Sequence, residues 1–286
     1  MKDWRNSRAW RMLVSRYGES EARAIVYYVM ETCFNIKKED FLADGLDSLR
    51  SEQVPRLMAM LFKTAEGTPV QYVTGLADFG GRHGYTYIGV SPGVLIPRPE
   101  TAELCDWIID DYGSRKGLDI LDACTGSGCI AVMLKLVMPE CRLWAWDNSL
   151  AALGTARRNA SAKGIDIVVE YQDVLDIRTA ERRWDVIASN PPYVLDSEKK
   201  DIEEHVIKHE PAEALFVPDG DPLRFYTPIA RYAAKTLRPG GALYFELNPL
   251  TADKTAEMAR REGFAEVEIR EDCYGKRRMM KARMAD

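Results

Sequence analysis

Residues 118–137 read LDILDACTGSGCIAVMLKLV, and this stretch decides the fold class. A short apolar run, Leu118–Ala123, has the length of a buried strand, and the following stretch, Ser127–Val137, has that of a helix. The turn between them contains Gly126 and Gly128. A glycine-bearing turn from strand to helix lets a ligand approach the backbone and meet free N–H groups at the helix N-terminus. The stretch therefore predicts the first strand of an α/β sheet that binds a ligand.

The alternation of strand and helix continues toward the end of the chain. Further strands are expected at Arg142–Asp147, Ile167–Gln172, Trp184–Ser189 and Ala242–Leu247, and a helix at Leu150–Lys163. This alternation predicts a doubly wound, mostly parallel sheet. The last two strands, Glu266–Arg270 and Met279–Arg283, are joined by a link too short for a parallel crossover, so we expect them to be antiparallel.

The chain is predicted to have three parts. Residues 1–75 read as a small helical bundle because apolar residues recur at helical spacing, as Ala22, Ile25, Val26, Val29 and Met30 do. Residues 76–94 are rich in glycine and aromatic side chains, which indicates a β-hairpin that links two domains. Residues 95–286 contain the parallel sheet.

Composition excludes several classes of protein. The 286 residues are 46% hydrophobic and 29% charged, as in a globular protein, and 39 basic against 44 acidic residues give a net charge of −5. An acidic balance argues against direct nucleic acid binding as the main role. A charged N-terminus and the absence of a long apolar run predict a cytoplasmic protein with no membrane partner. The six cysteines read as reduced thiols, and His205 and His209 lack a third ligand, so no metal site is expected.

Acidic residues end the second and third predicted strands. Asp147 lies about twenty residues after the glycine turn, where a carboxylate accepts hydrogen bonds from both ribose hydroxyls, and Asp173 lies where an adenine amino group would be. NAD enzymes, other nucleotide binders and methyltransferases share this arrangement, and a tight turn with capping carboxylates would also explain it. The turn T-G-S-G lacks a full G-x-G-x-x-G, so a pyrophosphate would have no cradle. This favours S-adenosylmethionine, which has no pyrophosphate.

The fourth predicted strand ends in Ser189-Asn190-Pro191-Pro192-Tyr193. Two consecutive prolines have a fixed φ and no N–H, so they form a rigid corner whose carbonyls stay outside the ladder of the sheet. There Asn190 Oδ1 and the Pro191 carbonyl can accept from one NH₂ group, while Tyr193 packs against a flat amide or base. Two fixed acceptors bias the nitrogen lone pair toward a methyl donor and stabilise the positive charge that develops. The motif predicts methyl transfer to an amide or amino nitrogen.

With these motifs, the chain resembles the HemK-type peptide chain release factor glutamine methyltransferase family over nearly its full length. Amino-methylating DNA enzymes share Asn190–Tyr193, so other segments carry the resemblance. These segments are Pro69–Gly75, Val94–Thr101, Glu210-Pro211 with Ala214-Leu215 and Asp219-Gly220, Leu237–Gly241 leading to Glu246, and the closing Asp272, Gly275 and Arg278.

The resemblance implies a seven-stranded, Rossmann-like class I methyltransferase domain and an N-terminal bundle that docks the substrate. It implies an enzyme of translation termination that methylates class 1 release factors on the side-chain amide nitrogen (N5) of the glutamine in their Gly-Gly-Gln motif. S-adenosyl-L-methionine would donate the methyl group and leave as S-adenosyl-L-homocysteine. The implied cofactor-binding residues are Cys124, Thr125, Gly126, Ser127, Gly128, Asp147, Asp173, Val174 and Asn190. The implied substrate-binding residues are Asn190, Pro191, Pro192 and Tyr193, of which Asn190, Pro191 and Tyr193 are catalytic.

Three positions depart from the family pattern. Cys124 replaces the usual glycine, and we expect it to have a negative φ, which its Cβ would require. Ala102 stands where the family has a second acid; Glu103 follows it about 100° further round a helix. Val174 is smaller than the aromatic residue often found near the adenine.

Three alternatives stay open. Glutamine methylation of another protein, such as a ribosomal protein, uses the same chemistry, and only the docking surface distinguishes the two. Methylation of DNA adenine would need a basic target-recognition segment and a path for a flipped base, and the acidic chain has no inserted basic domain. A non-catalytic binding module would have no use for Asn190 and Asp147.

Overall fold

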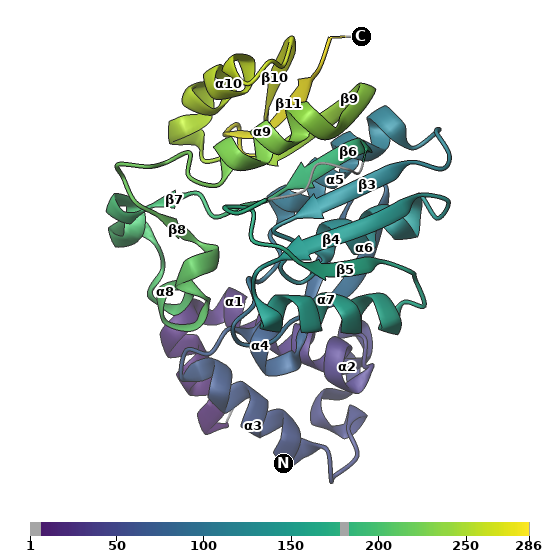
Figure 1. Cartoon of the computed structure of the whole chain (residues 1–286). Helices are drawn as coiled ribbons and strands as arrows, with labels where there is room; N and C mark the ends of the chain where they lie inside the picture. Colours follow the sequence, from purple (N-terminus) through teal and green to yellow (C-terminus); the bar gives the residue numbers. More distant parts are fainter. Residues whose placement is uncertain (1–6, 178–182, 286) are drawn as a thin grey trace. The chain divides into compact units, whose positions relative to one another are not determined.

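The computed structural model describes residues 7–177 and 183–285. The chain forms two compact units (Figure 1). The helical unit contains residues up to Leu76 together with Glu203–His209, and the sheet unit contains Ala77–Ile202 and the residues from Glu210 onward. None of the helices in the described part of the chain is both long and apolar enough to cross a membrane.

The helical unit has a core of its own. Its elements are α1 (Arg8–Phe34), α2 (Lys38–Asp44), η2 (Gly45–Ser48), α3 (Val54–Ala65), α4 (Val70–Thr74) and α8 (Glu204–His209). The stripe on α1 that contains Val26 and Val29 is buried in one cluster with Leu57 and Leu61 of α3. α1 bends at Gly18, whose φ of 78° and ψ of 166° are not helical.

The sheet unit is built on seven strands in the order β10-β11-β9-β6-β3-β4-β5. Their bounds are β3 (Asp119–Ala123), β4 (Arg142–Asp147), β5 (Val168–Tyr171), β6 (Trp184–Ser189), β9 (Leu237–Glu246), β10 (Glu266–Glu271) and β11 (Arg277–Arg283). Neighbouring strands are parallel, except that β11 is antiparallel to both β9 and β10. The predicted doubly wound sheet and its antiparallel last pair are confirmed.

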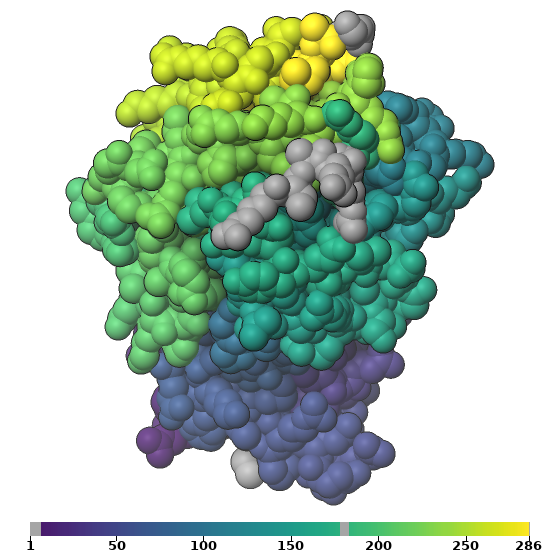
Figure 2. All heavy atoms as spheres, viewed as in Figure 1, coloured from purple at the N-terminus to yellow at the C-terminus, as the bar shows by residue number. Residues whose placement is uncertain are grey.

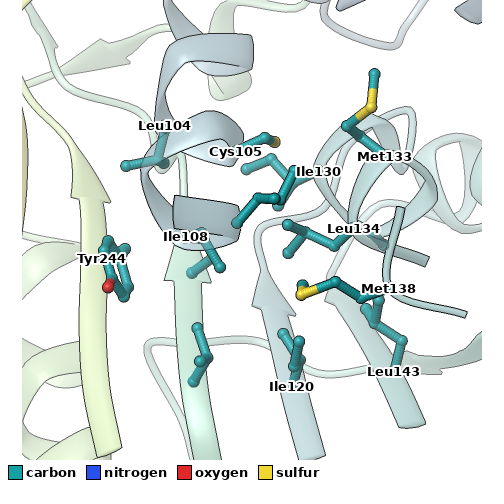
Figure 3. Packing of buried hydrophobic residues seen from close by; sticks show 14 of the residues in the cluster. Leu104, Cys105, Ile108, Ile120, Ile130, Met133, Leu134, Met138, Leu143 and Tyr244 are labelled. Carbon is teal, nitrogen blue, oxygen red and sulfur yellow. The ribbon is translucent and has the colours of Figure 1, made fainter. Parts of the chain in front are cut away.

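Helices pack on both faces of this sheet (Figure 1). They are α5 (Pro99–Tyr112), α6 (Cys129–Val137), α7 (Leu150–Ala162), α9 (Tyr226–Thr236) and α10 (Ala252–Arg261). Figure 3 shows one layer, in which Ile108 of α5 and Leu134 of α6 share a buried cluster with Ile120 of β3. The next residue of β3, Leu121, belongs to the cluster with α9 and α10 on the opposite face. Because side chains of a strand alternate between faces, a strand covered on both sides is mostly apolar, and the two aspartates of β3, Asp119 and Asp122, are buried.

The last part of the chain extends the sheet with α10, β10 and β11. Its atoms form one continuous block, yellow in Figure 2. β9 begins at Leu237, five residues before the expected Ala242, because Leu237 pairs with Trp184 across an irregularity that precedes the regular pairing of Ala242 with Val186. A second, small parallel sheet joins β7 (Val194–Leu195) to β8 (Phe216–Val217), which no sequence pattern indicated.

The glycine-rich segment before α5 forms a hairpin of β1 (Leu76–Gly81) and β2 (Gly84–Gly89). Its turn is held by Asp106 of α5, which accepts hydrogen bonds from the N–H groups of Arg82 (2.7 Å) and His83 (3.2 Å). A Cβ on Gly81 would lie 2.2 Å from the same carboxylate, so only glycine allows this close approach.

Candidate active site

A cavity of about 460 Å³ lies in the sheet unit, where the carboxyl ends of β3, β4 and β6 meet. Ligands of doubly wound sheets bind at this edge, and the volume is that of a small-molecule site. Its lining residues are Gly93, Val94, Leu95, Cys124, Gly126, Asp147, Asn148, Ser149, Ala152, Gln172, Val174, Leu175, Asn190, Pro192, Pro211, Glu213, Ala214, Arg224 and Phe225.

The predicted site residues divide into those that line this cavity and those that support it. Cys124, Gly126, Asp147, Val174, Asn190 and Pro192 belong to the lining. Thr125, Ser127, Gly128, Asp173, Pro191 and Tyr193 are neighbours of these in the chain and lie outside it. Asp173, for example, uses its Oδ1 to accept a hydrogen bond from the N–H of Leu175 at 2.9 Å.

The two glycines of the turn have different reasons to be glycine. Gly126 has a φ of +55°, but a Cβ there would meet no atom of the described residues within 4 Å, so its backbone conformation alone favours glycine. Gly128 has a φ of +81°, and its Cβ would lie 3.0 Å from the Cβ of Ala156. Gly128 therefore also allows α7 to pack closely against the turn.

The expectation of a negative φ at Cys124 is wrong, because its φ is +61°. The chain is fixed on both sides of this residue. The carbonyl of Ala123 accepts from Ser189 Oγ at 2.6 Å, and the N–H of Thr125 donates to the carbonyl of Trp146 at 2.9 Å. A left-handed conformation at a non-glycine residue costs about 1–2 kcal/mol, which these contacts offset.

Asp147 holds two parts of the cavity wall together. Its Oδ2 accepts from the N–H of Gly126 (2.9 Å) and its Oδ1 from the N–H of Ser149 (2.8 Å). Burial raises the pKa of Asp147, and these backbone donors oppose the rise. Both oxygens are thereby fixed in a position that leaves the carboxylate on the cavity wall.

Asp122 lies directly behind the turn and is fully buried. Its Oδ2 accepts from the hydroxyl of Thr125 (2.5 Å) and the N–H of Ala131 (3.2 Å), while its Oδ1 has no partner among the described residues. Burial raises the pKa of Asp122 to about 7, against the effect of those two donors. The sequence signal for Asp122 is an acidic residue inside an otherwise apolar strand. No role is assigned to it from the sequence.

The hydrogen bonds at the proline corner involve the nitrogen of the Asn190 amide and the hydroxyl of Tyr193. The Nδ2 of Asn190 donates to Thr101 Oγ1 at 3.1 Å. Among the described residues, no donor is bonded to the Oδ1 of Asn190 or to the carbonyl of Pro191. The hydroxyl of Tyr193 donates to Glu246 Oε1 at 2.8 Å. The position of the Tyr193 ring is therefore fixed by a residue that does not line the cavity.

Other residues of the site had no role assigned from the sequence. Glu210 is buried and accepts from the N–H of Ile96 (2.9 Å) and from the Nη2 of Arg98 (2.6 Å), which anchors the loop that carries Pro211 and Ala214 to the cavity. Arg224 and Phe225 also line the cavity, and no local pattern pointed to them.

The departure from the family pattern at Ala102 also has a structural account. Ala102 is buried in the core of the sheet unit, where a carboxylate would be desolvated. Glu103 instead accepts from the N–H of Cys273 at 3.3 Å.

Among residues 7–177 and 183–285, no three His, Cys, Asp or Glu side chains form a group that could hold a metal ion.

Two solved structures that share the fold of this chain are methyltransferases. The 16S rRNA N2 G1207 methyltransferase of T. thermophilus, in complex with AdoMet and guanosine, matches with a TM-score of 0.55 and 18% identity over 73% of this chain and 50% of that chain. The ribosomal protein L11 methylase of Lactobacillus delbrueckii subsp. bulgaricus matches with a TM-score of 0.52 and 17% identity over 73% of this chain and 100% of that chain. The fold is therefore that of the class I methyltransferases.

Sequence comparison gives the family. The methyltransferase small domain matches residues 108–223, and the PrmC N-terminal domain matches residues 8–75. The release factor glutamine methyltransferase of Flavobacterium psychrophilum is 37% identical over 94% of both chains, and that of Bacteroides thetaiotaomicron is 42% identical over 78% of both. The chain belongs to the release factor glutamine methyltransferase family and is a methyltransferase.

Proposed function

We propose that this enzyme transfers a methyl group from S-adenosyl-L-methionine to the side-chain amide nitrogen of the glutamine in the Gly-Gly-Gln motif of class 1 release factors. The observation that carries the proposal is the corner at Asn190 and Pro191, whose two oxygens have no partner among the described residues. Asn190 and the next proline, Pro192, line the cavity. Translation occurs in the cytoplasm, so we assign the activity to that compartment.

The cavity fits the methyl donor in its polar groups and its size. We assign the ribose to Asp147, whose carboxylate is fixed by two backbone N–H groups, and the adenine to the apolar walls at Val174 and Leu175. The amino-acid end is assigned to the turn from Cys124 to Gly128. When bound, the donor supplies a sulfonium methyl group, which is a strong electrophile.

The residues of the corner then act on the glutamine amide. An amide nitrogen is a poor nucleophile because its lone pair is delocalised into the carbonyl group. Asn190 Oδ1 and the Pro191 carbonyl each accept one of its N–H groups, which fixes the nitrogen and orients the lone pair toward the methyl group. The same oxygens stabilise the positive charge that forms on nitrogen during transfer. The C–S bond of the donor breaks as the N–C bond forms, S-adenosylhomocysteine leaves, and the nitrogen loses one N–H proton to solvent. Pro192 on the cavity wall helps to exclude water.

The names of the relatives favour a release factor over the other substrates. The relatives from F. psychrophilum and B. thetaiotaomicron are both named for release factor glutamine methylation. We assign substrate docking to the predicted bundle 1–75 and the predicted linker 76–94.

A labelling experiment tests the proposal. The purified protein is incubated with S-adenosylmethionine labelled on the methyl group and a class 1 release factor, with the Asn190→Ala variant as the catalytic control. We expect label on the wild-type release factor and none on a release factor with Gln→Ala in its Gly-Gly-Gln motif. Equal labelling of both release factors would disprove the assignment of the substrate.

A further inference from the structure

We propose that Thr101 and Glu246 are positioning residues that determine which atom of the Asn190 amide faces the substrate. This inference rests on the proposed function, because it concerns the acceptor that binds the substrate NH₂ group. Neither residue lines the cavity, and we had assigned neither a role from the sequence.

The three side chains form a chain of hydrogen bonds. Glu246, at the end of β9, accepts from Thr101 Oγ1 at 2.6 Å, and Thr101, in the first turn of α5, accepts from Asn190 Nδ2 at 3.1 Å. Glu246 and Thr101 are each 1% exposed, so water does not compete for these bonds. Asn190 is the member of the chain that reaches the cavity wall.

The direction of each bond follows from the carboxylate. An ionised carboxyl group only accepts hydrogen bonds, so the Thr101 hydroxyl must donate its single proton to Glu246. The hydroxyl then has only lone pairs to offer to Asn190, which must turn its NH₂ group toward Thr101. The Oδ1 of Asn190 consequently faces away from Thr101 and is free to accept from the substrate.

The opposite orientation of the amide is strongly disfavoured. If Asn190 turned its Oδ1 toward Thr101, two acceptors would face each other in a dry environment, and a buried polar atom without a partner is costly. In that orientation the NH₂ group of Asn190 would also face the NH₂ group of the substrate. A free asparagine could adopt either orientation, and the buried carboxylate removes this choice.

Glu246 fixes the second part of the corner as well. Its Oε1 accepts from the Tyr193 hydroxyl at 2.8 Å, so one oxygen of Glu246 binds Tyr193 and the other binds Thr101, the partner of Asn190. Arg278 lies near this hydroxyl, with its Nη1 at 3.5 Å, and donates to the Leu247 carbonyl at 3.2 Å. Burial raises the pKa of Glu246, whereas the hydrogen bonds from Thr101 and Tyr193 and the nearby Arg278 cation oppose the rise and favour the ionised carboxylate, which is the form that sets the direction of the bonds.

Substitutions at Thr101 separate a positioning role from a merely structural one. Thr101→Val keeps the shape and removes the hydroxyl, whereas Thr101→Ser keeps the hydroxyl. The matched control is Thr255→Val, since Thr255 is also fully buried in a helix but its hydroxyl donates to the Thr251 carbonyl at 3.0 Å. We expect Thr101→Val to lower kcat about 10- to 100-fold, as does the loss of one oriented hydrogen-bonding group, with the affinity for the methyl donor unchanged.

The pattern across the variants decides the matter. Thr101→Ser should restore most of kcat, and Thr255→Val should keep the wild-type value. Glu246→Gln should give a smaller loss than Thr101→Val, because a glutamine amide still offers Thr101 an acceptor in one of its two orientations. The inference is wrong if Thr101→Val keeps kcat, or if Thr101→Ser loses as much as Thr101→Val.

A measurement without substrate tests the same point independently of the proposed function. The chain has six asparagines, so selective ¹⁵N-asparagine labelling gives few side-chain NH₂ signals in an NMR spectrum. The signals of Asn190, identified by their loss in Asn190→Ala, should shift and exchange faster with solvent in Thr101→Val, and should stay in place in Thr255→Val. Unchanged Asn190 signals in Thr101→Val would refute the inference. A protein that shows the shift but labels no release factor would instead contradict the proposed substrate alone.

Discussion

Single polar residues of this site have two kinds of environment. Asp147 is a carboxylate whose two oxygens are already bound by backbone N–H groups. Asn190 is an amide whose nitrogen is bound and whose oxygen has no partner in the described part of the chain. The first arrangement fixes a wall for a ligand to bind against. The second leaves one acceptor for a reacting group. The two residues should therefore affect different steps of the reaction.

Asp147→Asn should weaken binding of the methyl donor. Asparagine has one acceptor oxygen, so either the N–H of Gly126 or that of Ser149 would face an NH₂ group and the wall would loosen. We expect the Kd for S-adenosylmethionine to rise about tenfold, which corresponds to about 1.4 kcal/mol, by isothermal titration calorimetry. At saturating donor, kcat should change far less than in Asn190→Ala. A variant with unchanged Kd and reduced kcat would contradict the role of Asp147.

Asp122 gives the stability of the protein a dependence on pH. Its pKa of about 7 in the folded protein lies above the ordinary value of 3.8, so between these values the folded state holds a proton that the unfolded state has lost. Stability from this group is therefore present at low pH and is lost as pH rises toward and through 7. Asp122→Asn cannot ionise, so its Tm relative to wild type should rise between pH 5 and pH 8. Parallel Tm curves for the two proteins would show that Asp122 does not titrate in this range.

The turn between β3 and α6 is the element on which the cavity depends. Two positive-φ glycines and the positive-φ Cys124 let the chain leave a buried strand, expose backbone to the cavity and enter a helix within a few residues. A Cβ at position 128 would contact Ala156 of α7, whereas one at position 126 would meet none of the described residues within 4 Å, so substitutions at the two positions should have different costs.

Gly128→Ala should destabilise the protein more than Gly126→Ala. Both would place a Cβ on a left-handed residue, at a cost of about 1–2 kcal/mol, but only the Cβ at 128 would approach Ala156. Gly164→Ala is the control, because Gly164 has a φ of +64° and open space around it. Urea unfolding should give similar losses for positions 126 and 164 and a larger loss for 128. Equal losses of unfolding free energy at positions 126, 128 and 164 would mean that α7 moves to accept the new Cβ without an energetic cost.

At the scale of the whole molecule, the cavity belongs to the sheet unit alone. Every residue of its lining lies between Gly93 and Phe225 and outside Glu203–His209. Binding of the methyl donor should therefore not depend on the sequence of the helical unit, whereas we have assigned that unit to the choice of protein substrate.

A transplant tests this division of roles. Residues 8–75, which match the PrmC N-terminal domain, are replaced with the equivalent segment of the F. psychrophilum relative. We expect the Kd for S-adenosylmethionine to stay the same. The ratio of kcat/KM for the release factor of F. psychrophilum to that for the release factor of the original organism should rise. If the ratio stays that of the original protein, substrate choice resides in the sheet unit.

The sequence by itself determined the architecture, and six of the residues expected at the site line the cavity. Strands Arg142–Asp147 and Trp184–Ser189 occur with the predicted bounds, because short apolar runs between turn residues reflect local backbone preference and burial on both faces. The proline corner was predictable for the same reason, since the fixed φ of proline acts on its own residue and the one before it. The domain boundaries at 75 and 94 stay predictions.

Only the tertiary structure decided how the side chains of the site are oriented. The hydrogen bond from Asn190 to Thr101 spans 89 residues of sequence, and that from Thr101 to Glu246 spans 145. The positive φ of Cys124 depends on contacts of its neighbours with two other strands, and Glu203–His209 joined the helical unit without any local signal. Periodicity and turn chemistry report on a few adjacent residues. The direction of a buried hydrogen bond depends on which distant donor or acceptor the packed chain places opposite it.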